Sequence, residues 1–546
     1  MFRKSDPQPS LFLTANILPA QMLARLERDW PGPFRSAVLP LIDEEKFRPL
    51  YHADNGRPNT PVRLVLGVLL LKEFFDLTDE EALAELAFDM RWHVALDRTL
   101  EDAPCCQKTL HNFRVNLQKH DALHPEFVAL TGKMIAAMGL SVEKQRLDST
   151  HILSNIARLN RLGLFCETVR VFLSDLRKTC PAAFAAVPEG LRRRYLKEDG
   201  GAAAYQDVRK EEAPRRLKVC ARDLWRLIDR FGQDEQVRVR PSYALLNRLF
   251  MEQCEVAAHA GVPETGDADA AEPLVAVTLK EPKEVGSASL QSPHDPDVTY
   301  SGHKGKGYEV QVVETHGNGE KPELITGVEV TDSCTSDEAA AVPVLEDLRQ
   351  AGLQPRELEA DTTYGSVANA MEFEKAGTEL VAPVSGPEVQ PLAEGAHRID
   401  EFQMDVVGEG PVVCPRGQKT TVLRSETGRI HARFSPEQCA GCPFQAGCPT
   451  RRNRDGSRSL ITKRKAYVLE KRRRYEATEE FHRRYASRAG IEATHSELKR
   501  AHGLGRLRVR GGKRVRLAVY LKVLACNIKR MVKYLAAEAR RCDEGA

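Results

Sequence analysis

The sequence lacks any uninterrupted run of about 18 apolar residues, the length that a membrane-spanning helix requires. The apolar stretch at residues 62–75 is too short and contains charged residues. The first ten residues, MFRKSDPQPS, also lack the apolar core and the cleavage site of a secretory signal. We therefore expect no membrane partner and a cytoplasmic location. In that compartment the 13 cysteines should stay reduced or bind metal rather than form disulfides.

The chain also lacks an internal repeat and a large net charge, which is only +3 over 546 residues. That length predicts two to four domains. The charge is distributed unevenly: residues 451–546 contain 28 Lys and Arg against 10 Asp and Glu, a net of +18, and the first 450 residues have a net of −15. A basic C-terminal region of this kind favours contact with nucleic acid. The alternative is a tail that binds polyanions without specificity, but periodic apolar residues between 486 and 537 predict folded helices there.

One constellation of polar side chains stands out near the C-terminus, in YASRAGIEATHSELKR. On a continuous α-helix its members project within an arc of about 60°, because each residue advances about 100°. They are Tyr485, Arg488, Glu492 and Lys499. A carboxylate can hold a divalent metal and neighbouring cations can hold phosphate. The alternative is a solvated helix face with ion pairs at spacings of three and four.

This Tyr-x2-Arg-x3-Glu-x6-Lys spacing resembles the signature around the catalytic glutamate of bacterial insertion-sequence transposases of the DDE type. The resemblance implies three metal-binding acids on distant segments: Asp148, Asp361 and Glu492. These would hold two Mg²⁺ or Mn²⁺ ions, while Tyr485, Arg488 and Lys499 would contact DNA phosphates. Asp148 lies within a strand pattern, LDSTHI, where a buried acid needs a partner.

Two other acids, Asp332 and Glu497, compete with Asp361 and Glu492 for their places in this triad. Asp361 ends the short strand ELEA and is followed by Tyr364, as in the resembled family, although an acid there could instead cap the next helix. Asp332 ends the preceding strand and is an alternative to Asp361. Glu497 is the nearest competitor of Glu492, but it points about 120° around the helix, away from Arg488.

The pattern of elements predicts an α+β protein with a ribonuclease-H-like mixed sheet as its core. A Thr78 and Glu81 capping box starts one N-terminal helix, and Ser336 caps a helix that runs to residue 350. We expect an N-terminal helical domain at 1–140. The core should comprise a first strand at 141–152, a further part at 298–385 and a basic helical end at 461–546. Between these parts we expect a helical insertion at 153–260, a linker at 261–297 and a Cys-rich insertion at 386–460 before the catalytic Glu helix. The N-terminal helices resemble the end-binding domain of the same transposases, with a dimerisation bundle as the alternative.

Four cysteines lie between Asp361 and Glu492, in CPRG and CAGCPFQAGC. They match a structural zinc site in ligand number, and Cys-x2-Cys is a usual half-site. The alternative is a set of reduced structural cysteines. The four are Cys414, Cys439, Cys442 and Cys448.

A basic segment, RLRVRGGKRVR, directly follows the Glu492 helix. Phosphate contact there would give salt-sensitive affinity for DNA, and a solvated charge run is the alternative. Its candidate contacts are Arg506, Arg508 and Arg510. A second basic segment, SGHKGKGY, could bind phosphate, but its glycines and its place at the start of a strand favour interpretation as a plain hairpin turn.

The resemblance implies metal-dependent cleavage of DNA at the terminal inverted repeats of an insertion sequence, followed by strand transfer into target DNA. Joining two ends in one event implies a homodimer in the DNA complex, associated with the nucleoid. Two other functions remain open at this stage: a catalytically silent DNA-binding regulator, and a metal-dependent nuclease without strand transfer.

Overall fold

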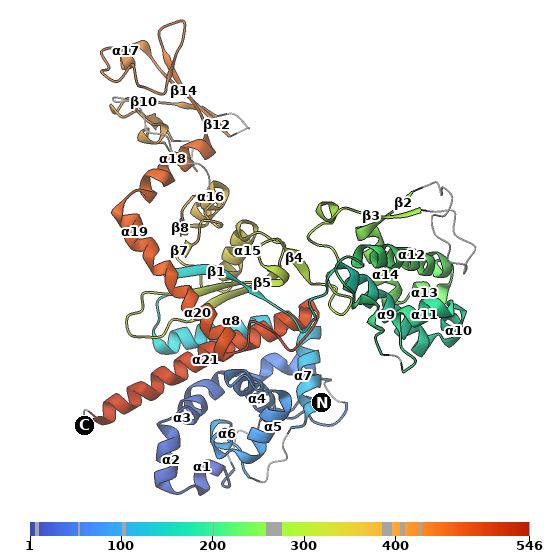
Figure 1. Ribbon diagram of the computed structural model, residues 1–546. Helices are drawn as coiled ribbons and strands as arrows, with labels where there is room; N and C mark the ends of the chain where they lie inside the picture. Colours follow the sequence, from blue (N-terminus) through green and yellow to red (C-terminus); the bar gives the residue numbers. More distant parts are fainter. Residues whose placement is uncertain are drawn as a thin grey trace.

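The computed structural model describes residues 1–5, 10–52, 55–100, 105–199, 201–257, 276–384, 396–404, 410–424 and 428–544 (Figure 1). Its centre is a mixed sheet in which the strands follow the order β6, β5, β1, β7, β8, with β4 paired to β5. The bounds are β1 Lys144–Ile152, β4 Thr299–Ser301, β5 Gly305–Thr315, β6 Ile325–Asp332, β7 Glu357–Ala360 and β8 Glu379–Val381. β5 is antiparallel to its neighbours β1 and β6, which therefore run in the same direction, and β7 and β8 run parallel to β1.

Helices cover this sheet on both sides. α15 (Asp337–Gln350) packs on β6 and α16 (Val367–Ala376) packs on β8. α8 (Leu123–Met138), α20 (Ile491–Ala501) and the long α21 (Gly512–Glu544) also contact the sheet, and α8 and α21 lie on the side opposite α15 in Figure 1. Because it is covered, the central strand β5 is buried from residue 307 to its end, polar residues included.

The N-terminal helices share one hydrophobic core with the sheet. Among them, α4 is buried almost all round and packs along α21. Lys522 of α21 donates to the carboxylate of Glu73 at 2.6 Å, and both side chains are buried. The N-terminal helices are α1 Thr14–Ile17, α2 Ala20–Glu27, α3 Pro31–Pro33, α4 Val62–Phe74, α5 Asp79–Phe88, α6 Met90–Ala95 and α7 Gln107–Lys119. None of the described helices combines the length and the apolar character needed to cross a bilayer.

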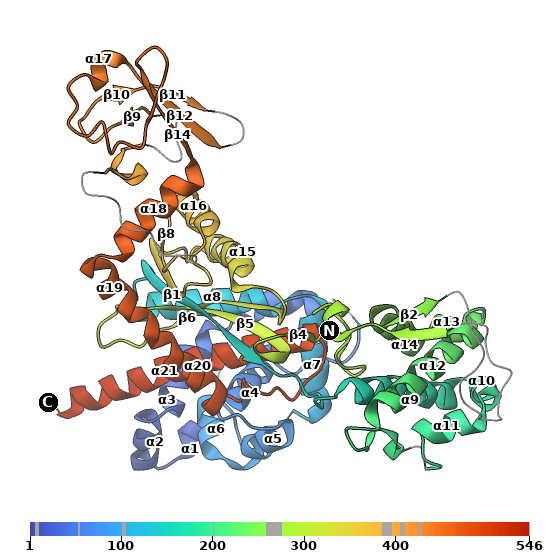
Figure 2. The ribbon, with the colours of Figure 1, turned by 45° about the horizontal axis from the view of Figure 1, so that its top comes forward.

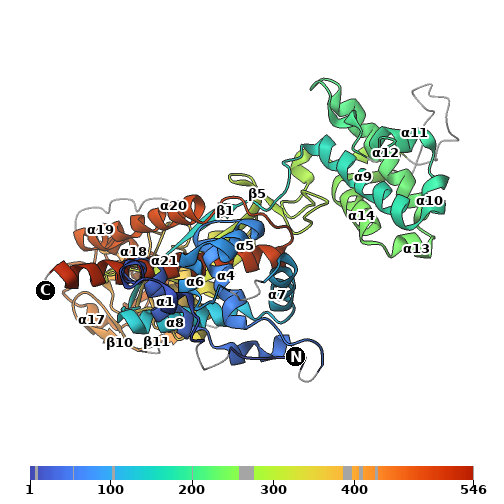
Figure 3. The ribbon, with the colours of Figure 1, turned by 90° about the horizontal axis from the view of Figure 1, so that it is seen from below.

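The segment after β1 forms a separate helical lobe with its own core, which Figure 3 shows standing apart from the sheet. It contains α9 Arg161–Thr179, α10 Pro181–Ala186, α11 Glu189–Tyr195, α12 Ala213–Phe231, α13 Glu235–Arg238, α14 Pro241–Gln253, β2 Cys254–Ala257 and β3 Ala276–Leu279. The expected linker at 261–297 lies partly outside the described residues. From residue 276 onward it is structured instead, because β3 pairs with β2 and Leu290 is fully buried against this lobe.

The Cys-rich segment forms a small β lobe beyond α18, which Figure 2 shows far from the helical lobe. It contains β9 Val412–Val413, β10 Lys419–Thr420, β11 Val422–Arg424, β12 Arg429–Phe434, α17 Pro436–Cys439, β13 Arg451–Arg452 and β14 Arg458–Lys463. α18 (Arg464–Glu476) and α19 (Glu479–Tyr485) then lead back to the sheet.

One helix expected to run unbroken from Tyr485 to Lys499 is interrupted. α19 ends at Tyr485, a 3-10 turn covers Ala486–Gly490, and α20 begins at Ile491. The turn is held by Ser487, whose hydroxyl donates to Glu359 of β7 at 2.6 Å. Arg146 of β1 lies against Gly490 so closely that a Cβ there would be 1.9 Å from its Nη1. The tertiary contact therefore overrides the local helical periodicity.

Candidate active site

The sheet register brings Asp148 and Asp361 together. Leu147 of β1 pairs with Ala360 of the parallel strand β7, so the residues that follow them, Asp148 and Asp361, emerge side by side. Asp361 stands just past the end of β7, where its Oδ1 accepts from the amide of Thr363 at 2.8 Å. It does not cap the next helix, because Ser366 caps α16.

Arg488 joins the two aspartates to the glutamate. Its Nη2 lies 2.9 Å from Oδ2 of Asp148 and 3.9 Å from Oδ2 of Asp361. Its Nη1 lies 3.8 Å from Oε1 of Glu492, in the first turn of α20. Three carboxylates separated by hundreds of residues in sequence thus surround one guanidinium.

The three acids differ in their exposure to solvent. The side chain of Asp148 is 13% exposed and that of Asp361 is 30% exposed, whereas that of Glu492 is 70% exposed. Burial raises the pKa of Asp148 above its ordinary value against the opposing effect of Arg488, and the charge of Asp361 raises it further. The site is therefore a cluster of acids with one desolvated member and one side open to solvent.

The two other members of the sequence motif flank this cluster. Tyr485 stacks on Phe481 with ring centroids 5.5 Å apart and an interplanar angle of 10°. Burial raises the pKa of Tyr485, and the charges of Asp361 and Asp148 add to that effect. Lys499 is exposed on the last turn of α20, with its stem against Gly505. Tyr485 thus lies within electrostatic range of both aspartates, whereas Lys499 lies two turns beyond Glu492 on α20.

Two further groups near Asp148 were not part of the expected site. His495 of α20 is buried, and its Nδ1 lies 3.9 Å from Oδ2 of Asp148. Burial, together with Lys499 and Arg488, lowers the pKa of His495 to about 4, so the imidazole is neutral at neutral pH. Glu492 and His495 are three residues apart and therefore share one face of the helix. This spacing is the feature of the sequence from which His495 could have been predicted as a site residue.

Lys304 is the second of these groups. It belongs to the β4–β5 hairpin, which forms as the SGHKGKGY segment predicts. Its Nζ donates to the hydroxyl of Ser149 at 3.1 Å and to Oε2 of Glu309 at 2.9 Å. Glu309 in turn contacts His151 at 2.9 Å. A cation is thereby fixed beside the strand that carries Asp148.

The competing acids occupy other places. Glu497 points away from the cluster, as expected, and pairs with Arg530 of α21 at 2.8 Å. Asp332 is exposed at the end of β6 and lines a different pocket, together with Lys513 and Arg516. Neither acid contacts Arg488.

Of the five arginines in the basic segment, the three candidate DNA contacts are exposed, but each also donates to the protein. Arg506 reaches the carbonyl of Ile156 at 3.4 Å, and Arg510 donates to the carbonyl of Asn155. Arg508 contacts Asp76 at 3.1 Å and the carbonyl of Leu77 at 3.0 Å. This segment therefore ties α20 and α21 to the ends of β1 and α4, and these contacts use part of the hydrogen-bonding capacity of each arginine.

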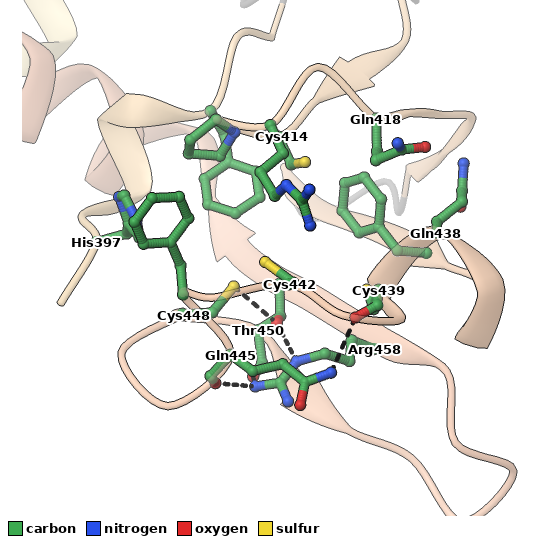
Figure 4. Close-up of a pocket in the computed structure, with 15 residues that line it drawn as sticks. His397, Cys414, Gln418, Gln438, Cys439, Cys442, Gln445, Cys448, Thr450 and Arg458 are labelled. Atoms are coloured by element: carbon green, nitrogen blue, oxygen red, sulfur yellow. Dashed lines mark hydrogen bonds between the residues drawn. The ribbon is translucent and has the colours of Figure 1, made fainter. Parts of the chain in front are cut away.

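The four cysteines of the β lobe line one small cavity of about 40 Å³ (Figure 4). Burial raises the pKa of Cys439, and the other three thiols raise it further against the effect of Arg458. Cys448 lies 3.0 Å from the hydroxyl of Thr450, to which Arg458 also donates at 2.7 Å. Soft sulfur donors suit a structural zinc ion, but these four cysteines do not supply a set of three ligand atoms within 4.8 Å of one another, so zinc binding here stays a prediction.

Two family models match parts of the chain. Residues 413–532 match the model described as Transposase DDE domain, and this segment contains Arg488 and Glu492. Residues 25–116 match the model described as Transposase domain (DUF772). No curated protein and no solved structure matches the chain.

These matches support a DDE transposase, an enzyme class that acts on DNA and generally uses divalent metal ions. The two segments flank the aspartates: Asp148 and Asp361 lie between the matched ranges, and only Glu492 lies within one. The mixed α+β architecture fits that class.

Proposed function

We propose that this chain is a transposase that cuts DNA at the ends of a bacterial insertion sequence and transfers the freed strand into target DNA. The observation that carries this proposal is the convergence of Asp148, Asp361 and Glu492 on one guanidinium. The strand order β6-β5-β1-β7-β8, in which β5 alone runs against the other four strands, supports a ribonuclease-H-like core.

The residues fit divalent magnesium or manganese. Arg488 already supplies positive charge between the carboxylates, which indicates where the acids need a counter-charge. Their oxygens are hard donors of the kind that Mg²⁺ prefers. We propose that Asp148, Asp361 and Glu492 hold two such ions, which would activate the attacking oxygen and stabilise the leaving one.

The protein side chains have their own roles in this proposal. Asp361 and Glu492 face solvent enough to admit a phosphodiester, whereas the burial of Asp148 strengthens its electrostatic interactions. Arg488 is a planar cation suited to a bidentate contact with phosphate. Lys304 provides a cation beside β1, Lys499 provides one on the helix of Glu492, and Tyr485 supports the site through its stacking on Phe481.

The basic C-terminal region and the N-terminal helices complete the proposed DNA surface. Residues 451–546 have a net charge of +18, which favours contact between α18 to α21 and the phosphate backbone of DNA. We propose that Arg506, Arg508 and Arg510 add such contacts, that the N-terminal helices bind the terminal inverted repeats, and that two chains act together in the cytoplasm at the nucleoid. Zn²⁺ held by Cys414, Cys439, Cys442 and Cys448 would stabilise the β lobe.

The test is cleavage of DNA that carries the sequences flanking the gene, in the presence of Mg²⁺. Glu492→Gln should abolish cleavage while DNA binding persists, because an amide cannot replace the anionic ligand. Asp332→Asn is the matched control, since this acid also ends a core strand but lies in another pocket, and it should cut normally.

The outcomes separate the three candidate functions. Cutting and joining support a transposase, cutting without joining indicates a nuclease, and binding without cutting indicates a silent regulator. Survival of cleavage in Glu492→Gln would show that the third acid is misassigned.

A further inference from the structure

A second cluster of metal-type donors lies behind α20, on the side away from the three acids. In the part of the chain that the structure describes, one set of three donors has all its ligand atoms within 4.8 Å of one another: Glu497, His502 and Cys526. Glu497 lies on α20, His502 directly follows that helix, and Cys526 lies in the middle of α21. His502 and Cys526 are completely buried.

The imidazole of His502 is oriented as a ligand. Its Nδ1 lies 2.9 Å from the carbonyl oxygen of Glu73, which can only accept, so Nδ1 carries the proton. The lone pair then resides on Nε2, which is buried and has no hydrogen-bond partner among the described residues. A histidine that binds a metal through one nitrogen commonly donates the other to a backbone carbonyl in this way.

The remaining two donors complete a mixed set. Both contacts from Arg530 reach Oε2 of Glu497, which leaves Oε1 as a possible ligand atom. Cys526 supplies sulfur, and its proton would leave when the metal binds, because the thiolate is the ligand. Burial lowers the pKa of His502 to about 4, so no proton has to leave the imidazole at neutral pH.

We propose that Glu497, His502 and Cys526 bind a zinc-type transition-metal ion, with solvent as the fourth ligand. Sulfur, imidazole and carboxylate together suit zinc better than magnesium. The side chain of Glu497 is 29% exposed, which gives the ion and the solvent ligand a route into an otherwise closed place. The ion would fasten the end of α20 to α21 and thereby fix the helix that carries Glu492.

The test measures zinc in the purified full-length chain. Cys526→Ala and His502→Gln should each lose one equivalent of zinc relative to wild type. Cys254→Ala is the matched control, since this cysteine is also buried but belongs to the helical lobe, and it should retain all the zinc. Cys442→Ser separates this site from the β lobe and should keep the equivalent that Cys526→Ala loses.

Cobalt provides a second measurement if Cys526→Ala does not fold. Co²⁺ added to metal-free Cys442→Ser should give a charge-transfer band for thiolate bound to cobalt, and Cys526→Ser in the same background should weaken it by the share of one thiolate, since three cysteines of the β lobe remain. Unchanged zinc content in Cys526→Ala and His502→Gln would overturn the proposal. So would a cobalt spectrum that is the same with and without Cys526. In either case the three groups form a hydrogen-bonded cluster only.

Discussion

Arg530 of α21 offers the sharpest test of how the candidate active site is held in place. Its Nη1 lies 3.1 Å from Oε2 of Glu314, a carboxylate in β5 with no solvent exposure. Its guanidinium also contacts Glu497 at 2.8 Å and the hydroxyl of Thr494 at 2.6 Å, both on α20. One buried cation thus joins the sheet to the helix of Glu492.

The cost of Arg530→Ala follows from these contacts. Removing one partner of a buried ion pair costs about 3–5 kcal/mol. Arg146 still contacts Glu314 at 2.7 Å, so the buried carboxylate keeps one partner. We therefore expect the lower end, about 3 kcal/mol, concentrated on the docking of α20. Arg541→Ala is the matched control on the same helix, because Arg541 is 70% exposed and pairs with an exposed Glu320, and it should cost no more than about 0.5 kcal/mol.

Hydrogen exchange of the amides in α20 is the appropriate assay, because a chain with several lobes does not unfold in one step. A loss of about 3 kcal/mol corresponds to exchange faster by on the order of 100-fold in α20. Amides in the helical lobe should exchange as in wild type. If Arg530→Ala accelerates exchange in α20 no more than Arg541→Ala does, the ion network does not hold this helix and the reasoning is refuted.

Three further predictions concern buried titratable groups and metal. His495 and His502 have a pKa lowered to about 4, chiefly by burial, so the unfolded chain takes up more protons between pH 6.5 and 4. Their contribution to stability is complete above pH 6.5 and is lost as the pH falls to about 4. Replacing each by Gln should flatten the pH dependence of the opening free energy of α20, measured by hydrogen exchange, and an unchanged slope would contradict the assignment. Burial raises the pKa of Glu126 to about 7, so its carboxylate costs stability as the pH rises from 4.5 to about 7. Glu126→Gln should raise the opening free energy of α8, measured by hydrogen exchange, by about 2–3 kcal/mol at pH 8 and have little effect at pH 4, whereas an equal effect at both pH values would exclude titration as the cause. Cys442→Ser should release zinc from the β lobe and lower its melting temperature, and unchanged melting with no bound metal in wild type would refute that site.

Local patterns in the sequence predicted most of the elements around the site. β1, β5, β6 and β7 lie where alternating or apolar runs indicated strands, and the Thr78 capping box and the Ser336 cap are both present. These features depend on neighbouring residues only, which is why a single sequence reveals them.

Features that depend on distant residues were not predictable in the same way. The break before Ile491 arises from Arg146, which lies in β1, and the burial of His495 arises from its packing against the sheet. The tether from Arg508 to Asp76 joins residues at opposite ends of the chain. The run of basic residues after the Glu492 helix predicts a DNA contact for Arg508, because the sequence cannot show that an acceptor within the protein already engages it.

The position of α21 has a consequence for synthesis of the protein. The first long helix, α4, buries its apolar surface against the last one, and α8 and the sheet use the same partner. During translation these early segments must therefore wait, with their apolar faces uncovered, until residues 512–544 have emerged from the ribosome. A chain that stops short of Gly512 would lack the element that closes its interior, and such a truncated product should be a substrate for chaperones and proteases rather than a competing DNA-binding fragment.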